Sequence, residues 1–149
     1  MDLPVLGQRK RQCGACTMCC KVMGVTELEK PPAVWCEHCT PGKGCNIYED
    51  RPPTCREFEC LWLLDENWPE DVRPDKSHVV MAATKDGARL VANVDPARPN
   101  AYMTGRIGTI LRNLSDSKDV IIVIGDKRKA LTTQGRAQEL LRLAAEERK

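Results

Sequence analysis

The chain has 149 residues, enough for one domain with a modest hydrophobic core and too few for two large ones. Lysine plus arginine number 23 and aspartate plus glutamate 21, so the formal net charge is only +2. This balance disfavours a nucleic-acid-binding surface, which needs a strong excess of basic side chains. The sequence has no run of about 18 apolar residues and no secretory signal pattern, so we expect a cytoplasmic protein without a membrane-spanning helix.

The first half of the chain is rich in cysteine. All nine cysteines lie between residues 13 and 60, and four of them fall in the stretch CGACTMCC, residues 13–20. Because the cytosol keeps thiols reduced and an odd number of cysteines cannot pair completely, metal binding is favoured over a disulfide framework. Disulfides would become the leading interpretation only if the protein were secreted.

Prolines and glycines interrupt this region at short intervals, as in KPP (30–32), TPGKG (40–44) and RPP (51–53). Such residues favour loops over long helices or strands. A region broken in this way buries little continuous apolar surface. Bound metal would supply the missing stability, since its binding free energy is then folding free energy. We therefore predict an irregular, metal-stapled module over residues 1–75.

The second half, residues 76–149, has the pattern of a small sheet with helices. Apolar runs at 78–84 and 89–94 predict two strands, and Asp86-Gly87 between them predicts a hairpin turn. A helix is predicted next, over residues 100–114. Its apolar face carries Met103, Ile107, Ile110, Leu111 and Leu114.

The end of the chain repeats this order of elements. Residues 119–125 and 129–133 predict a second hairpin, and Thr133 is a suitable N-cap for a final helix. The apolar stripe of that helix carries Ala137, Leu140, Leu141, Ala144 and Ala145. The order hairpin, helix, hairpin, helix predicts an α+β fold, with a small antiparallel sheet and the helices on one face. We expect the two halves to pack together as one compact unit.

The spacing of the cysteines is typical of metal binding. Zinc and iron accept thiolate ligands, and two cysteines separated by two residues reach one ion without strain. Three pairs have this spacing: Cys13 with Cys16, Cys16 with Cys19, and Cys36 with Cys39. Further thiols come from Cys45, Cys55 and Cys60. We predict a protein that binds one or two zinc ions, in a structural role or in metal storage or handling.

The adjacent residues Cys19 and Cys20 restrict how the thiols can be divided between metal ions. Neighbouring side chains point in different directions in both helices and strands, so either the two serve different ions or one of them is not a ligand. In a helical segment Cys13, Cys16 and Cys20 would share a face. Two four-thiolate sites would use eight of the nine cysteines, and Cys20 and Cys39 are the candidates for the spare thiol.

Other polar side chains near the cysteines have less specific roles. His38 is a weaker candidate ligand, because a histidine in this position is as often an exposed loop residue. Arg51 is expected to satisfy backbone carbonyls or to offset thiolate charge, and Arg56 and Lys43 are further candidates for the second role. His78 is expected to be an ordinary surface residue. No catalytic constellation can be identified, so enzymatic activity is left open and a non-enzymatic role is favoured.

An iron or iron–sulfur site is the alternative to zinc, in a redox component or as part of a modification enzyme. Residues 13–19 match the first three ligands of a bacterial ferredoxin run, but the rest of that run, three residues and then Cys-Pro, is absent. A thioredoxin-like role is disfavoured because only loop-like sequence precedes Cys13. The expected partner is a metal ion, without membrane or nucleic acid, and the sequence indicates no particular protein partner.

The cysteine motifs resemble those of the CxxCxxCC family, whose members are described as zinc- or iron-chelating. The resemblance is carried by CGACTMCC (13–20) and WCEHCTPGKGCNIYEDRPPTCREFEC (35–60), and it covers about a third of the chain. The later part, from RPDKSHVV onward, looks like an extension found in short bacterial members. Similar cysteine patterns occur in a flagellin lysine methyltransferase family, which keeps an enzymatic setting open.

The resemblance implies metal chelation by eight cysteines. Carried over to this sequence, they are Cys13, Cys16, Cys19, Cys20, Cys36, Cys45, Cys55 and Cys60. Cys39 is then additional and, like His38, a weaker candidate ligand. The resemblance names no substrate.

Overall fold

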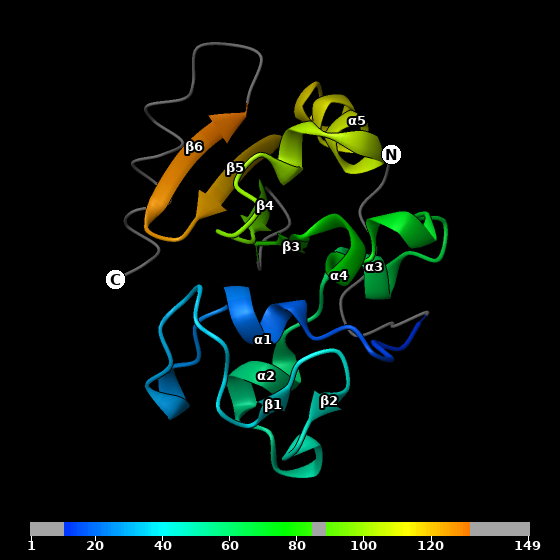
Figure 1. The fold of residues 1–149 in the computed structure, drawn as a ribbon. Helices are drawn as coiled ribbons and strands as arrows, with labels where there is room; N and C mark the ends of the chain where they lie inside the picture. Colours follow the sequence, from blue (N-terminus) through cyan, green and yellow to red (C-terminus); the bar gives the residue numbers. More distant parts are fainter. Residues whose placement is uncertain (1–10, 85–88, 132–149) are drawn as a thin grey trace.

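The computed structural model describes residues 11–84 and 89–131, in which a cysteine-rich part lies beside a four-stranded sheet (Figure 1). Helices and strands both occur in this part of the chain, which confirms the predicted α+β class. The large sheet and the helix that covers it come from residues after 78, where the apolar periodicity predicts them.

The cysteine-rich part is built from very short elements, as its prolines and glycines lead us to expect. Pro53 and Pro74 each stand in the first turn of a helix, where the missing N–H costs no hydrogen bond. Gly42 has a φ of 77° in the turn between two short strands. The elements are α1 (Met18–Val22), η1 (Thr26–Leu28), β1 (Cys39–Thr40), β2 (Gly44–Cys45), η2 (Tyr48–Asp50), α2 (Pro53–Glu57), α3 (Leu61–Leu64), η3 (Glu70–Val72) and α4 (Pro74–Ser77).

The larger sheet is mixed, which corrects the predicted antiparallel sheet. In spatial order its strands are β3 (Val79–Ala83), β4 (Arg89–Val94), β5 (Asp119–Ile124) and β6 (Lys127–Leu131). The pairs β3–β4 and β5–β6 are antiparallel hairpins, as predicted. The central pair β4–β5 is parallel, with Leu90 opposite Val120 and Val94 opposite Ile124. The segment between β4 and β5 carries the chain back along the sheet, and such a crossover is what a parallel pair requires.

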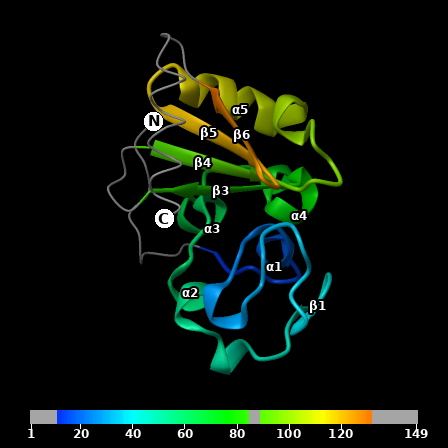
Figure 2. The ribbon, with the colours of Figure 1, turned by 90° about the vertical axis from the view of Figure 1, so that its left-hand side faces the viewer.

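The crossover contains η4 (Ala101–Met103) and α5 (Gly105–Ser115). These two elements replace the single helix predicted over residues 100–114. Met103, predicted on the apolar face, is instead 51% exposed. Gly108 explains the difference, because a Cβ there would lie 2.7 Å from the backbone carbonyl carbon of Met103. The glycine lets η4 fold back closely onto α5, which lies along one face of the sheet (Figure 2).

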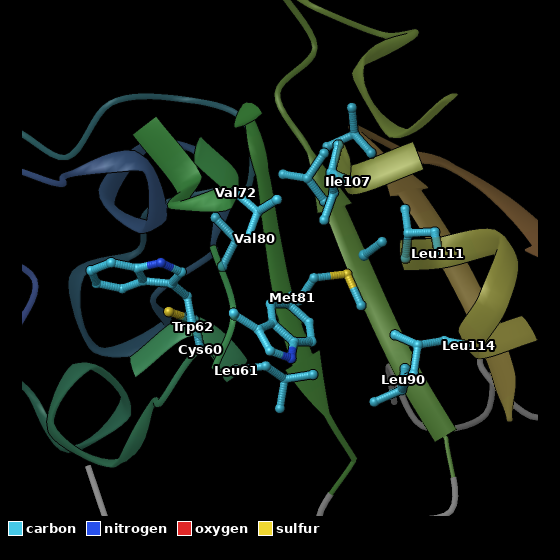
Figure 3. Packing of buried hydrophobic residues seen from close by; sticks show 14 of the residues in the cluster. Cys60, Leu61, Trp62, Val72, Val80, Met81, Leu90, Ile107, Leu111 and Leu114 are labelled. Atoms are coloured by element: carbon cyan, nitrogen blue, oxygen red, sulfur yellow. The ribbon is translucent and has the colours of Figure 1, made fainter. Parts of the chain in front are cut away.

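One hydrophobic core joins the sheet, α5 and the cysteine-rich part. Helix α5 lies on one side of β3, whereas Cys60 and Trp62 lie on the other (Figure 3), and η3, which carries Val72, contacts α5. Helix α1 adds Met18 and Val22 to the same cluster. The cluster therefore crosses the predicted boundary at residue 75, and it places the start of α3 against the sheet.

Two predictions concern residues outside the described part of the chain. The hairpin turn at Asp86-Gly87 lies in residues 85–88, and the final helix with its cap at Thr133 lies in residues 132–149. The strand predicted over residues 129–133 corresponds to β6, which begins earlier, at Lys127.

Candidate functional site

The stretch from Cys13 to Cys20 folds into a tight turn followed by a short helix. The backbone N–H of Cys16 donates to the carbonyl of Cys13 at 3.0 Å, and Gly14 has a φ of 58° inside this turn. Helix α1 begins only at Met18, so Cys13 and Cys16 do not share a helical face with Cys20. Cys19 and Cys20 both lie in α1, where consecutive side chains diverge by about 100° around the helix axis.

The second closely spaced pair, Cys36 and Cys39, is tied to α1 through the main chain. The N–H of Cys36 donates to the carbonyl of Cys20 at 3.0 Å. The N–H of Cys39 donates to the carbonyl of Cys36 at 3.1 Å, which repeats the turn seen between Cys13 and Cys16. Cys39 then stands directly opposite Cys45 in the β1–β2 pair. Backbone bonds therefore bring together thiols from distant parts of the sequence.

Cys55 and Cys60 come from the two helices that follow. Cys55 lies in α2, and Cys60 directly precedes α3. Cys60 is only 7% exposed. Burial is the largest influence on its thiol and raises the pKa of Cys60 to about 11, although the sulfur accepts the backbone N–H groups of Leu63 and Trp62.

The cysteines surround a cavity of about 160 Å³. Seven of the nine line it: Cys13, Cys16, Cys19, Cys20, Cys36, Cys45 and Cys55. Its other walls are mostly apolar and include Met23, Val25, Leu28, Ile47 and Phe58. The seven thiols are half-buried beside these apolar walls, and a lowered local dielectric strengthens the attraction between thiolates and a cation.

Several of these thiols have raised pKa values. For Cys20 the largest cause is a hydrogen bond with Cys19, followed by burial. Burial comes first for Cys16, Cys39 and Cys55, and it raises the pKa of Cys39 to about 12. Without a bound cation these thiols are protonated at neutral pH, so an incoming metal ion must displace protons.

Lys30 places a positive charge beside the thiols. Its ammonium group donates to the carbonyls of Lys21 and Pro31, both at 3.1 Å, and to that of Met23. Burial lowers the pKa of Lys30, while negative charge on nearby thiolates favours its charged form. The cysteines that act on it are Cys36, Cys20, Cys19 and Cys55. Sequence reasoning missed Lys30, because only the fold of the loop after α1 brings it to the cysteines.

Arg51 and Arg56 bond to carbonyls of the loop before Cys55. Arg51 donates to Tyr48 at 2.9 Å, and its guanidinium carbon lies 3.9 Å from the centre of the Tyr48 ring. Arg56 donates to Arg51 at 2.8 Å and to Glu49 at 2.7 Å. The carbonyl-bonding role expected for Arg51 is therefore confirmed.

The two histidines lie away from the cavity lining. His38 has its ring Nε2 3.5 Å from a carboxylate oxygen of Glu37 and is about one-third exposed. His78 bonds through Nδ1 to Asp95 at 3.1 Å, so it is more constrained than the ordinary surface residue expected. Asp95 is buried, and its other oxygen lies 2.7 Å from the ammonium nitrogen of Lys21. This ion pair ties α1 to the residue that follows β4, and nothing in the sequence marks it.

The thiols are neighbours but do not form a coordination sphere. In residues 11–84 and 89–131, no three His, Cys, Asp or Glu side chains are grouped so that they could hold a metal ion. The chemistry of the donor set, nine free thiols, fits a metal that prefers sulfur. The assignment of individual cysteines as ligands stays a prediction.

Comparison of the chain with protein-family models, with curated proteins and with solved structures found no match. The resemblance to the CxxCxxCC family therefore stays a prediction that rests on the cysteine motifs themselves. In the part of the chain that the structure describes, no helix is long and apolar enough to cross a membrane.

Proposed function

We propose that the protein chelates one or two zinc ions through cysteine thiolates, in a structural role or in the storage or handling of metal. The proposed ligands are Cys13, Cys16, Cys19, Cys20, Cys36, Cys45, Cys55 and Cys60. The observation that carries the proposal is the cavity of about 160 Å³ lined by seven cysteines. Ordinary core packing does not account for it, because these seven thiols come from two turns, two helices and one strand that the fold brings together.

A structural or storage role is favoured for the zinc, because closed four-thiolate sites are structural, whereas catalytic zinc keeps one position open for water. Eight thiols fill the coordination of two ions and leave no such position. A zinc ion bound by four thiolates carries a net charge of about −2. The charge of Lys30, which acts on four of the cysteines, offsets part of it.

An iron–sulfur cluster is the second candidate, and the size of the cavity is the observation that favours it. Four thiolates close directly around a single zinc ion. A cluster brings its own inorganic sulfide and occupies a larger volume between its cysteines. The protein would then serve as a redox component or as part of a modification enzyme.

The cytoplasm is the compartment we propose. All nine cysteines are free thiols in the structure, and the cytosol maintains thiols in that state. The near balance of 23 basic and 21 acidic residues gives no support to a nucleic-acid partner.

Elemental analysis of protein purified without oxygen, together with its visible absorption spectrum, tests the proposal. We expect one or two zinc ions per chain and a colourless protein. A brown protein with iron and inorganic sulfide would favour the second candidate. Protein that contains no metal, and takes up neither zinc nor iron after reduction, would refute both.

A further inference from the structure

We infer that the cysteines form two metal-binding groups, which adjoin the same cavity and meet at helix α1. The core group consists of Cys13, Cys16, Cys19 and Cys60. The outer group consists of Cys20, Cys36, Cys45 and Cys55, with Cys39 beside them. The inference rests on the proposed chelation and goes further, since it assigns each thiol to one of two sites.

The core group is defined by contact with the hydrophobic core. Cys60 belongs to the main cluster of buried residues, and Cys13, Cys16 and Cys19 pack against that cluster. Cys60 lies close enough to Cys13 and Cys16 for their charges to act on it. These four thiols therefore share one apolar neighbourhood at the junction of α1, α3 and the sheet.

Backbone N–H groups in the core group point at sulfur. Cys16 accepts the N–H groups of Met18 and Asp75, and Cys60 accepts those of Leu63 and Trp62. Such bonds stabilise a thiolate far more than a neutral thiol, because the acceptor then carries a full charge. The opposite charges of Arg73 and Asp75 both lie near Cys16. These bonds hold Cys16 and Cys60 in place, although burial outweighs their effect on the pKa of both thiols.

The outer group is held together away from that core. Among the described residues, its five cysteines lie outside the main hydrophobic cluster. The N–H of Cys36 bonds to Cys20, and Cys39 stands opposite Cys45. Cys55 in turn lies close enough to Cys20, Cys36 and Cys45 for their charges to act on it. Each member therefore has thiol neighbours within the group, and the positive charge of Lys30 lies near Cys20, Cys36 and Cys55.

The adjacent cysteines of α1 separate the two groups. Cys19 packs against the core and Cys20 does not, although the two thiols touch each other. Consecutive helical residues diverge by about 100° around the axis, so the two thiols approach the cavity from different directions although they are in contact. Assigning Cys19 to the core group and Cys20 to the outer group leaves each group with four thiolates, the number that one tetrahedral ion takes.

Cadmium is a suitable probe, because it prefers thiolates and has a spin-½ isotope, ¹¹³Cd. The reduced, metal-free full-length protein would be titrated with Cd²⁺ and followed by native mass spectrometry and ¹¹³Cd NMR. We expect two Cd²⁺ ions per chain and two resonances without coupling between them, because no thiolate bridges the ions. Because Cys60 is buried in the core, the core group is tested with Cys13→Ser instead, and the outer group with Cys36→Ser. Each variant is the control for the other.

We expect each variant to bind one Cd²⁺ ion and to lose a different one of the two resonances. Two cadmium resonances that are coupled, or the loss of both ions in either variant, would show a single shared cluster. Either result would overturn the division into two groups while chelation itself would stand. A chain that binds no Cd²⁺ at all would refute chelation as well, so the two failures are distinguishable.

Discussion

The two parts of the molecule are held together by different means. In the sheet part, β3, β4, β5 and α5 enclose fully buried side chains such as Leu90 and Leu111. Between residues 11 and 59, the buried hydrophobic residues are only Met18, Val22 and Val25. Helices of five residues or fewer are marginal in water without tertiary support. A cysteine-rich chain of this kind needs a source of stability besides apolar burial, and the proposed metal supplies it.

Removing the metal is expected to have the largest effect, because only the cysteine-rich part depends on it for stability. Metal bound by four thiolates contributes on the order of 10 kcal/mol to folding. A chelator should therefore abolish amide protection between residues 13 and 60, while β3 to β6 keep theirs for longer. Hydrogen exchange with mass spectrometry measures both regions in one experiment. Equal loss in the two parts, or no change in either, would contradict the contrast.

The ion pair between Lys21 and Asp95 joins the two parts, and removing its charge should loosen them. Asp95→Asn leaves the half-buried ammonium group without its carboxylate, and we expect a cost of about 3 kcal/mol. Glu70→Gln is the matched control, because the pairs of Glu70 with Arg73 and Lys76 are more exposed. The control should cost less than about 1 kcal/mol. Denaturant unfolding of both variants checks the difference.

The same carboxylate makes a pH-dependent contribution to stability. Burial acts to raise the pKa of Asp95, but hydrogen bonds from Lys21, the Ala97 N–H and His78 together hold it below its ordinary value. Its contribution is therefore present above about pH 4 and is lost as the pH falls through the folded-state pKa. The wild type should lose stability below about pH 4 more steeply than Asp95→Asn. Parallel acid-unfolding curves would contradict this.

Gly108 offers a test confined to the sheet part. An added Cβ would lie 2.7 and 2.9 Å from backbone atoms of Met103, which cannot move aside as a side chain can. Gly108→Ala gains up to about 1 kcal/mol in helix propensity but pays for overpacking of roughly 1–3 kcal/mol. We expect a net loss of about 1 kcal/mol. Thr109→Ala, on the exposed side of the same helix, should stay within about 0.5 kcal/mol in thermal unfolding.

Cys39→Ser should have the smallest effect. The Cys39 side chain is outside the cavity lining, and the motif resemblance assigns the eight ligand positions to other cysteines. Metal content per chain, measured by elemental analysis, should remain that of the wild type. A fall by one ion would show that Cys39 is a ligand.

Periodicity predicted the strands and α5 well, because the apolar residues of each element are buried at the spacing that its own sequence shows. It could not predict the parallel pairing of β4 and β5, because the local pattern of each strand is the same for either direction. Met103 was misplaced because the close approach permitted by Gly108 is a tertiary effect. Around the cysteines, the prolines and glycines predicted short elements, but the turns at Cys13 and Cys36 were not predicted. The position of Lys30 beside the cysteines depends on how separate loops meet, and no local sequence pattern contains that information.

The position of Cys60 has a consequence for the order of events during synthesis on the ribosome. Three thiols of the core group leave the exit tunnel well before Cys60, and the strands that bury Cys60 emerge later still. The outer group has no such dependence on the C-terminal strands. We therefore expect nascent chains to acquire the outer ion first, and pulse-labelled cadmium on stalled ribosomes would reveal the reverse order if this is wrong.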